Sequence, residues 1–146
     1  MKMLILRGNS GFYGGKNWPR GALDEPPALE YARRRGYEGQ VLDVEGNNSG
    51  PHSKQTKLAL ETWRSDDEAS ALYGFSGGGY NARWVIQALS GDERARLKLV
   101  VALGAPYDEL PHVYKPGNPW EVVYRLDPPG GHMDGPRALL ASLPPP

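Results

Sequence analysis

The feature of this sequence that most constrains its fold is an alternation of short apolar runs with stretches of helical periodicity. Five runs have the length and composition of buried strands, and helical patterns separate most of them. The expected strands are residues 3–6, 41–44, 69–75, 97–103 and 120–126. Repeated strand–helix–strand units predict a parallel sheet with right-handed crossovers, which places the chain in the α/β class.

Four helices are expected, and each is indicated by an apolar face or by residues typical of helix ends. Pro26-Pro27 opens the first helix, and Gly36 stands where a helix commonly ends. The others carry their apolar residues at helical spacing: Leu58, Leu60 and Trp63; then Ala82, Val85, Ile86 and Leu89; then Leu139, Leu140 and Leu143. For about five strands, the common doubly wound order is 2-1-3-4-5, with helices on both faces as a three-layer sandwich.

The composition bounds the domain count and the kinds of partner. With 146 residues, we expect one domain over residues 1–143, followed by a proline tail at 144–146. Lys plus Arg and Asp plus Glu are both 17, so the net charge is zero and nothing in the charge indicates nucleic-acid binding. The absence of cysteine excludes disulfides, thiolate metal sites and a thiol nucleophile.

The N-terminal run is too short and has the wrong flanks for a signal peptide, which needs roughly 7–15 apolar residues before a small-residue cleavage site. No run approaches the ~20 apolar residues of a membrane helix. The expectation from the sequence is therefore a cytoplasmic protein without a membrane span. Its oligomeric state is not indicated.

The predicted topology also says where a site should lie. In open parallel sheets, ligands bind outside the carboxyl ends of the strands, at the point where strand order reverses. That point brings the loop that begins at Gly8 next to the turn at Ser76. The loops that hold Asp108, Asp127 and His132 open at the same edge.

The turn at Ser76 has the pattern of an exposed nucleophile. Residues 74–78 read Gly-Phe-Ser-Gly-Gly, which matches G-x-S-x-G between a predicted strand and a predicted helix. Such a turn strains the serine backbone to expose its hydroxyl, so its neighbours must be small. The Gly77 amide, at the start of the helix, is a natural oxyanion donor. The alternative is a glycine-rich phosphate-binding turn, although these glycines do not spell G-x-G-x-x-G and no Walker lysine follows.

On these residues the sequence resembles the α/β-hydrolase superfamily, especially its small lipase, esterase and cutinase-like members. The resemblance rests on three segments: residues 72–79 are similar to the nucleophile elbow, 103–106 to a Gly-x-Pro strand end, and 122–128 to the strand that carries the acid. It implies a minimal α/β-hydrolase core without a cap domain, ester hydrolysis through an acyl-enzyme, and a triad in the order Ser, Asp, His. The chain departs from the family in having Arg7-Gly8-Asn9-Ser10 where a His-Gly motif is usual.

A serine nucleophile needs a histidine base and an acid that orients it. Among three histidines, His132 follows the last strand, whereas His52 lies beyond strand two and His112 in a long loop. Asp127 ends the fifth strand and is favoured as the acid, with Asp108 as the alternative. A third candidate, Asp134, is better placed to cap the final helix.

The remaining site residues come from the loops at the sheet edge. Asn9 or Ser10, after strand one, is expected to provide the second oxyanion donor, although a plain turn would look the same. Phe12, Tyr13 and Tyr107 either line a substrate groove or cover the sheet ends as ordinary packing.

The function expected from the sequence is a serine carboxylesterase or lipase-like hydrolase (EC 3.1.1 class) acting on small-molecule esters with short acyl chains. This chemistry requires no metal and no organic cofactor. Two alternatives from other classes stay open. One is a non-catalytic module that holds a phosphate-bearing ligand at the Ser76 turn. The other is an interaction domain that uses the aromatic loops and carries a vestigial triad.

Overall fold

The chain folds around a five-stranded, fully parallel sheet. The computed structural model describes residues 1–8, 11–13, 16–18, 24–44 and 49–146, with the backbone alone at 11–13 and 16–18. The strands of the sheet are β1 (Lys2–Leu6), β4 (Glu38–Val41), β5 (Ala69–Phe75), β6 (Leu99–Leu103) and β7 (Glu121–Arg125). Their order is β4-β1-β5-β6-β7, which is the predicted 2-1-3-4-5 arrangement.

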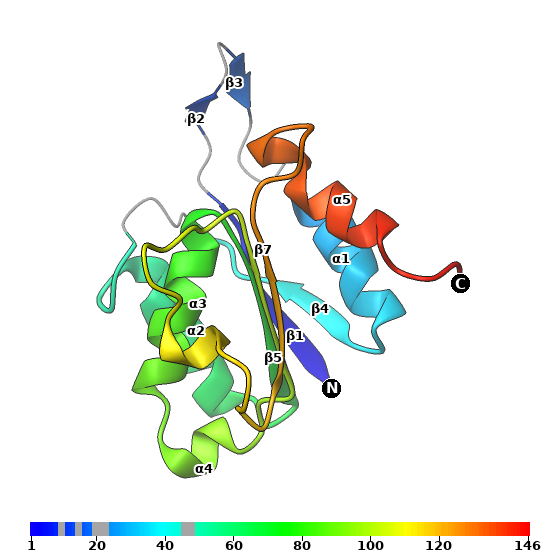
Figure 1. The fold of residues 1–146 in the computed structure, drawn as a ribbon. Helices are drawn as coiled ribbons and strands as arrows, with labels where there is room; N and C mark the ends of the chain where they lie inside the picture. The colour runs from blue at the N-terminus through cyan, green and yellow to red at the C-terminus, as the bar shows by residue number, and fades with distance from the viewer. Residues whose placement is uncertain (9–10, 14–15, 19–23, 45–48) are drawn as a thin grey trace.

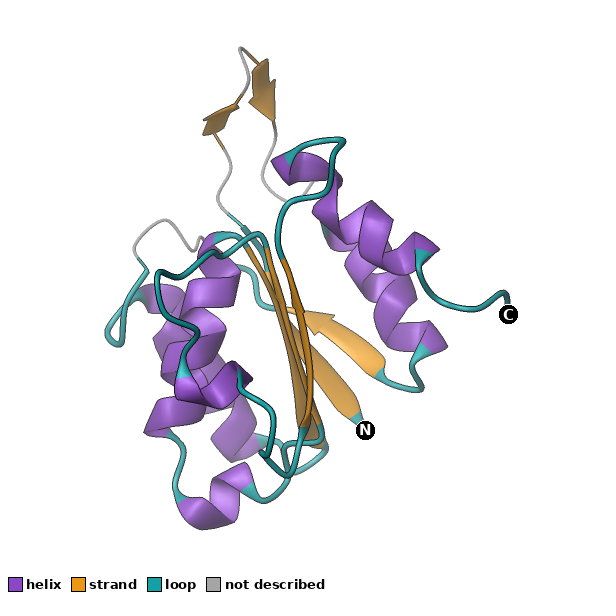
Figure 2. Cartoon of the chain, viewed as in Figure 1, coloured by secondary structure: helices purple, strands orange, loops and turns teal. Residues whose placement is uncertain are grey.

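Helices cover both faces of this sheet, as the three-layer prediction requires (Figure 2). The α-helices are α1 (Glu25–Arg34), α2 (Lys54–Ser65), α3 (Gly77–Ala88), α4 (Gly91–Arg94) and α5 (Gly135–Ala141). In Figure 1, α2 and α3 lie on one side of the sheet and α1 and α5 lie side by side on the other. Two short 3-10 helices, η1 (His112–Tyr114) and η2 (His132–Asp134), lie in the connections that flank β7. No helix within the described ranges is long and apolar enough to cross a membrane.

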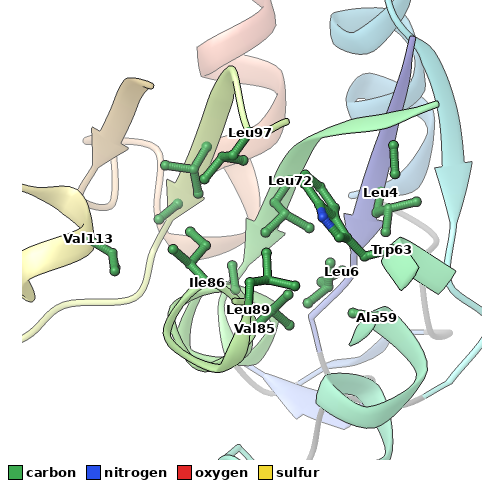
Figure 3. Packing of buried hydrophobic residues seen from close by; sticks show 14 of the residues in the cluster. Leu4, Leu6, Ala59, Trp63, Leu72, Val85, Ile86, Leu89, Leu97 and Val113 are labelled. Carbon is green, nitrogen blue, oxygen red and sulfur yellow. The ribbon is translucent and has the colours of Figure 1, made fainter. Parts of the chain in front are cut away.

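The alternation of side chains along the strands gives each face its own core. On the central strand β5 every residue is buried, with Leu72 among the side chains of α2 and α3 and Tyr73 among those of α1. On the α2–α3 face, the Trp63 ring is fully buried (Figure 3), and its indole N–H donates to the Glu93 carbonyl at 2.9 Å. The three inner strands, β1, β5 and β6, are buried almost throughout, which explains why they read as continuous apolar runs.

Two expectations about local structure are wrong. The second strand was expected at 41–44 but β4 occupies Glu38–Val41. An edge strand needs only one packed face, so its polar residues Glu38 and Gln40 gave no apolar signal. Leu42, just beyond β4, remains buried and donates its amide to the Ile5 carbonyl at 3.0 Å.

The segment from Gly8 to Glu25 was expected to be a loop, but it contains an antiparallel hairpin. Its strands are β2 (Gly11–Tyr13) and β3 (Lys16–Trp18), outside the main sheet (Figure 1). Three-residue strands are too short to show the apolar alternation by which strands are recognised. The hairpin extends beyond the carboxyl end of the sheet, the end at which the candidate site lies.

Candidate active site

Ser76 occupies a strained bend between β5 and α3. It is the N-cap of α3, with φ 56° and ψ −121°, and no other non-glycine residue in the described ranges has a positive φ. The surroundings fix this conformation: the Ser76 amide donates to the Leu103 carbonyl at 2.8 Å, and the Ser76 carbonyl accepts from the Gly79 amide at 2.9 Å. Backbone strain that is held in this way is characteristic of functional sites.

The glycines around Ser76 are needed for steric reasons. A Cβ atom on Gly78 would lie 1.9 Å from the Leu6 carbonyl oxygen, and one on Gly74 would lie 2.3 Å from the Gly78 carbonyl oxygen. Strands β1 and β5 and the first turn of α3 therefore meet backbone to backbone. This close approach holds α3 directly against the end of the sheet beneath Ser76.

His132 and Asp127 form a pair at the same end of the sheet. His132 Nδ1 lies 2.8 Å from Asp127 Oδ1. Asp127 follows β7, and His132 begins η2. The histidine side chain is largely covered, at 13% exposure, whereas the aspartate is 44% exposed. Of the three aspartates considered from the sequence, it is Asp127 that lies against His132 Nδ1.

The pair packs against the residues that surround Ser76. The His132 ring stacks on Phe75, the residue before Ser76, with ring centroids 4.9 Å apart and planes inclined by 25°. Gly104 has φ +60°, and a Cβ atom there would lie 2.7 Å from the His132 ring and 2.8 Å from Asp127 Oδ1. The residue before Gly104 is Leu103, whose carbonyl accepts from the Ser76 amide. The imidazole and the serine therefore pack against two consecutive residues, Gly104 and Leu103.

No hydrogen bond joins the Ser76 hydroxyl to the His132 ring, both of which belong to the described part of the chain. Hydrogen bonds between catalytic groups are often long in ligand-free sites and tighten when substrate binds. The contacts of His132 with Phe75 and Gly104, and the hydrogen bond of Ser76 to Leu103, keep the two residues in one locality. A serine side chain has a single rotatable angle with three staggered positions, so its hydroxyl is readily re-aimed.

Gly77 is placed to donate to an oxyanion. It is the first residue of α3, and the first amides of a helix have no acceptor within the helix. They also lie at the positive end of the helix dipole. Asn9 and Ser10, the expected second donors, lie outside the described residues. Gly8, which precedes them, is close to Ser76: a Cβ built on it would lie 3.2 Å from Ser76 Cβ.

The other polar candidates are exposed or pair with other groups. Asp108 is exposed in the connection between β6 and η1, His112 is exposed at the start of η1, and His52 is exposed in the turn before α2. Asp134 holds the N-cap position of α5, as expected, but its side chain makes no capping hydrogen bond. Its carboxylate pairs instead with Arg137 at 2.7 Å.

Tyr107 packs behind the first turn of α3 in a cluster of tyrosines. The members of this cluster are Tyr80, Tyr107, Tyr114 and Tyr124. The hydroxyls of Tyr107 and Tyr114 donate to the Gly79 carbonyl at 3.4 Å and 2.7 Å, and burial raises the pKa of Tyr107 to about 12. Tyr107 thus supports the first turn of α3. The side chains of Phe12 and Tyr13 lie outside the described residues.

A group of buried polar residues next to the site was not predicted from the sequence. Asp24 is 5% exposed, and Gln55 and Asn81 are fully buried. The latter two occupy core positions of their helices, since Gln55 is spaced four and eight residues from the buried Ala59 and Trp63. Asn81 has the same spacing from the buried Val85 and Leu89. A polar residue on an otherwise apolar helical face is the signal that could have revealed them.

Comparisons with known proteins agree with the fold. No protein-family model matches the chain, and no match was found among curated proteins. Among solved structures, a Trichoderma reesei cutinase in complex with a C11Y4 phosphonate inhibitor aligns with 88% of this chain at 18% identity and a TM-score of 0.51. A lipase-esterase related protein from Clostridium acetobutylicum aligns with 77% of the chain at 20% identity and a TM-score of 0.42.

The chain therefore has an α/β-hydrolase-like fold. It spans 61% of the length of the cutinase and 46% of the length of the second protein. At these identities the likeness shows the fold, and the chemistry must be argued from the site.

Proposed function

We propose that this protein is a serine hydrolase that cleaves carboxyl esters with short acyl groups through an acyl-enzyme intermediate. One observation carries the proposal: an aspartate-paired histidine packs on Phe75, the residue that precedes a positive-φ serine at the start of α3. The triad would be Ser76, His132 and Asp127. The α/β-hydrolase-like fold is a scaffold on which this constellation recurs.

The hydrogen bond within the pair supports the proposed roles of the two histidine nitrogens. With Nδ1 2.8 Å from the Asp127 carboxylate, the ring proton belongs on Nδ1, which leaves the Nε2 lone pair to act as base. As Ser76 Oγ attacks the ester carbonyl carbon, its proton passes to Nε2. Negative charge then develops on the carbonyl oxygen, which the Gly77 amide and a second donor from Asn9 or Ser10 stabilise.

The remaining steps follow from the same groups. The tetrahedral intermediate collapses with cleavage of the bond to the alcohol oxygen, which takes the proton from Nε2. A water molecule, deprotonated by the same nitrogen, then attacks the acyl-enzyme. Collapse of the second intermediate releases the carboxylic acid and returns the proton to Ser76 Oγ.

The preference for short acyl groups is proposed from the connections between the later strands. Residues 76–120, all described, hold only α3, α4, β6 and η1 as regular structure, so these connections add no cap domain. Without a cap, an acyl chain finds less apolar surface on which to bind.

Steady-state hydrolysis of p-nitrophenyl acetate and butyrate tests the proposal. We expect Ser76→Ala to abolish turnover, and Asp127→Asn to lower kcat by about 10²–10⁴-fold because the imidazole loses the partner that orients it. Asp108→Asn is the matched control and should leave kcat within about twofold, since the carboxylate that lies against His132 is that of Asp127.

Two results would contradict the proposal. One is wild-type turnover that Ser76→Ala does not diminish. The other is the absence of turnover together with a thermal shift on adding flavin mononucleotide that persists in Ser76→Ala, which would indicate a phosphate-binding module.

A further inference from the structure

Two buried amide side chains connect the nucleophile helix to the end of β1. Gln55 of α2 and Asn81 of α3 both have 0% exposure. Asn81 Nδ2 donates to Gln55 Oε1 at 2.9 Å, and Gln55 Nε2 donates to the Arg7 carbonyl at 2.9 Å. At the other end, Asn81 Oδ1 accepts from the Gly50 amide at 3.0 Å.

The direction of this chain of hydrogen bonds is fixed by its two ends. The Arg7 carbonyl can only accept and the Gly50 amide can only donate, so both side-chain amides must point one way. A glutamate at 55 or an aspartate at 81 would be nearly the same shape but would lack the required donor. The arrangement is therefore specific for amides and not merely for polar groups.

The Arg7 carbonyl is a sensitive place for such a hydrogen bond. A Cβ on Gly78 would lie 3.0 Å from the Arg7 oxygen, so this peptide packs on the first turn of α3. The next residue, Gly8, approaches Ser76 Cβ and donates its amide to the buried Asp24 carboxylate at 3.0 Å. The Arg7–Gly8 peptide is thus held from two sides where the chain leaves β1 beside the nucleophile.

Burial of two amides in an apolar core is costly unless every polar group is paired, and it then specifies one arrangement. Apolar side chains could fill the same volume between α2 and α3. They could not hold the Arg7 carbonyl at a fixed position relative to α3. The Gln55–Asn81 pair therefore links α3, which follows Ser76, to the end of β1.

We propose that Gln55 is a positioning residue, which with Asn81 aligns the Arg7–Gly8 peptide with Ser76. This inference rests on the proposed hydrolase function. The Gln55–Asn81 pair touches neither the substrate nor the reacting atoms. It acts through the backbone that borders the oxyanion, and displacement of that backbone by even ~1 Å is expected to slow the chemical step.

The test is kinetic, with two near-isosteric variants of Gln55. Gln55→Met and Gln55→Glu each remove the donor to Arg7, and Asn81→Asp removes the donor to Gln55. We expect each variant to lower kcat for p-nitrophenyl butyrate by roughly 10–100-fold, with KM changed by less than about twofold, because only transition-state contacts are disturbed. Thr62→Val is the matched control, since it deletes another hydrogen bond on α2, to the Leu58 carbonyl at 2.8 Å, and should leave kcat unchanged.

The coupling of the two positions separates positioning from simple packing. If Gln55 and Asn81 act as one unit, Gln55→Met/Asn81→Asp should lose no more in kcat than the worse single variant. Circular dichroism and thermal unfolding identify the folded variants, which are assayed well below their melting temperatures. A purely structural role would lower the melting temperature and leave kcat of the folded protein unchanged.

The proposed hydrolase function and the positioning role of Gln55 would be overturned by different results. Absence of Ser76-dependent turnover in the wild type removes the proposed function before any variant is compared. Ser76-dependent wild-type turnover with unchanged kcat in folded Gln55→Met and Gln55→Glu overturns the positioning role alone. Unfolding of every variant at both positions would show a structural role only and would overturn it as well.

Discussion

At the scale of single residues, the site depends on positions where no side chain fits. Ser76 adopts a positive φ that costs on the order of 1–3 kcal/mol, and the surrounding backbone maintains it because Gly74 and Gly78 let the strands and α3 come into contact. Gly104 is needed for the other half of the site. Because it has no side chain, the His132–Asp127 pair can pack directly against its Cα atom.

Gly78→Ala should therefore be strongly destabilising. Its methyl group would lie 1.9 Å from the Leu6 carbonyl oxygen, and backbone at both sides must move, which typically costs about 3 kcal/mol or more. Urea unfolding followed by circular dichroism measures the effect. Gly91→Ala is the matched control at the start of α4, where a Cβ would meet nothing within 4 Å. Equal stability of the two variants would refute the close approach.

The sequence supported the choice of Ser76, His132 and Asp127 as candidates because pattern and order along the chain identify such residues. It did not reveal Gln55 and Asn81. Their importance comes from which backbone groups they reach, 48 and 31 residues away along the chain, and such contacts follow only from the way the elements pack. The pairing of His132 with Asp127 and not Asp108 likewise needed coordinates.

At the scale of elements, prediction succeeded where burial dictates the sequence. The central strand β5 was expected at its observed bounds, because a strand covered on both faces must be apolar throughout. The edge strand β4 was displaced and the β2–β3 hairpin was missed, since neither needs a continuous apolar run. The start of α1 was located by its prolines, and Asp24, at its N-cap, was overlooked.

Asp24 links α1 to the end of β1 and should make stability depend on pH. Burial raises its pKa above 3.8, the effects of Glu25 and Arg7 being smaller. Because the folded state binds the proton more tightly than the unfolded state, stability from this group is greatest at low pH and falls as pH rises through the folded pKa. Asp24→Asn keeps an acceptor for the Gly8 amide and removes the titration.

The measurement is the free energy of unfolding of both proteins between about pH 4 and about pH 7, a window that starts near the unfolded pKa of an aspartate. The wild type should lose stability relative to Asp24→Asn as pH rises. A constant difference, or a wild type that gains on the variant with rising pH, would show that the carboxyl group is not desolvated in the fold.

At the scale of the whole molecule, one sheet joins two cores. Leu72 on β5 belongs to the core under α2 and α3, and Leu103 on β6 belongs to the core under α1 and α5. The alternation of strands and helices was sufficient to predict this layering and the strand order, because few topologies satisfy right-handed crossovers with short connections.

The two cores should unfold together. Leu72→Ala and Leu103→Ala should each lower the free energy of unfolding by about 2–5 kcal/mol, and the double variant should lose close to the sum. Tryptophan fluorescence reports on the first core, through Trp63 and Trp120. Leu103→Ala should nevertheless shift the fluorescence midpoint and the circular dichroism midpoint equally. A fluorescence midpoint that Leu103→Ala leaves unchanged would show that the two cores unfold independently.

The central claim is that the hydroxyl of Ser76 is an activated nucleophile, and covalent labelling tests it most directly. Folded protein would be treated with a fluorophosphonate probe and the adduct located by mass spectrometry of its peptides. The account predicts a single adduct on Ser76, which is lost in Ser76→Ala and forms much more slowly in His132→Ala. Folded wild-type protein that gains no adduct, or an adduct at another residue that persists in Ser76→Ala, would contradict it.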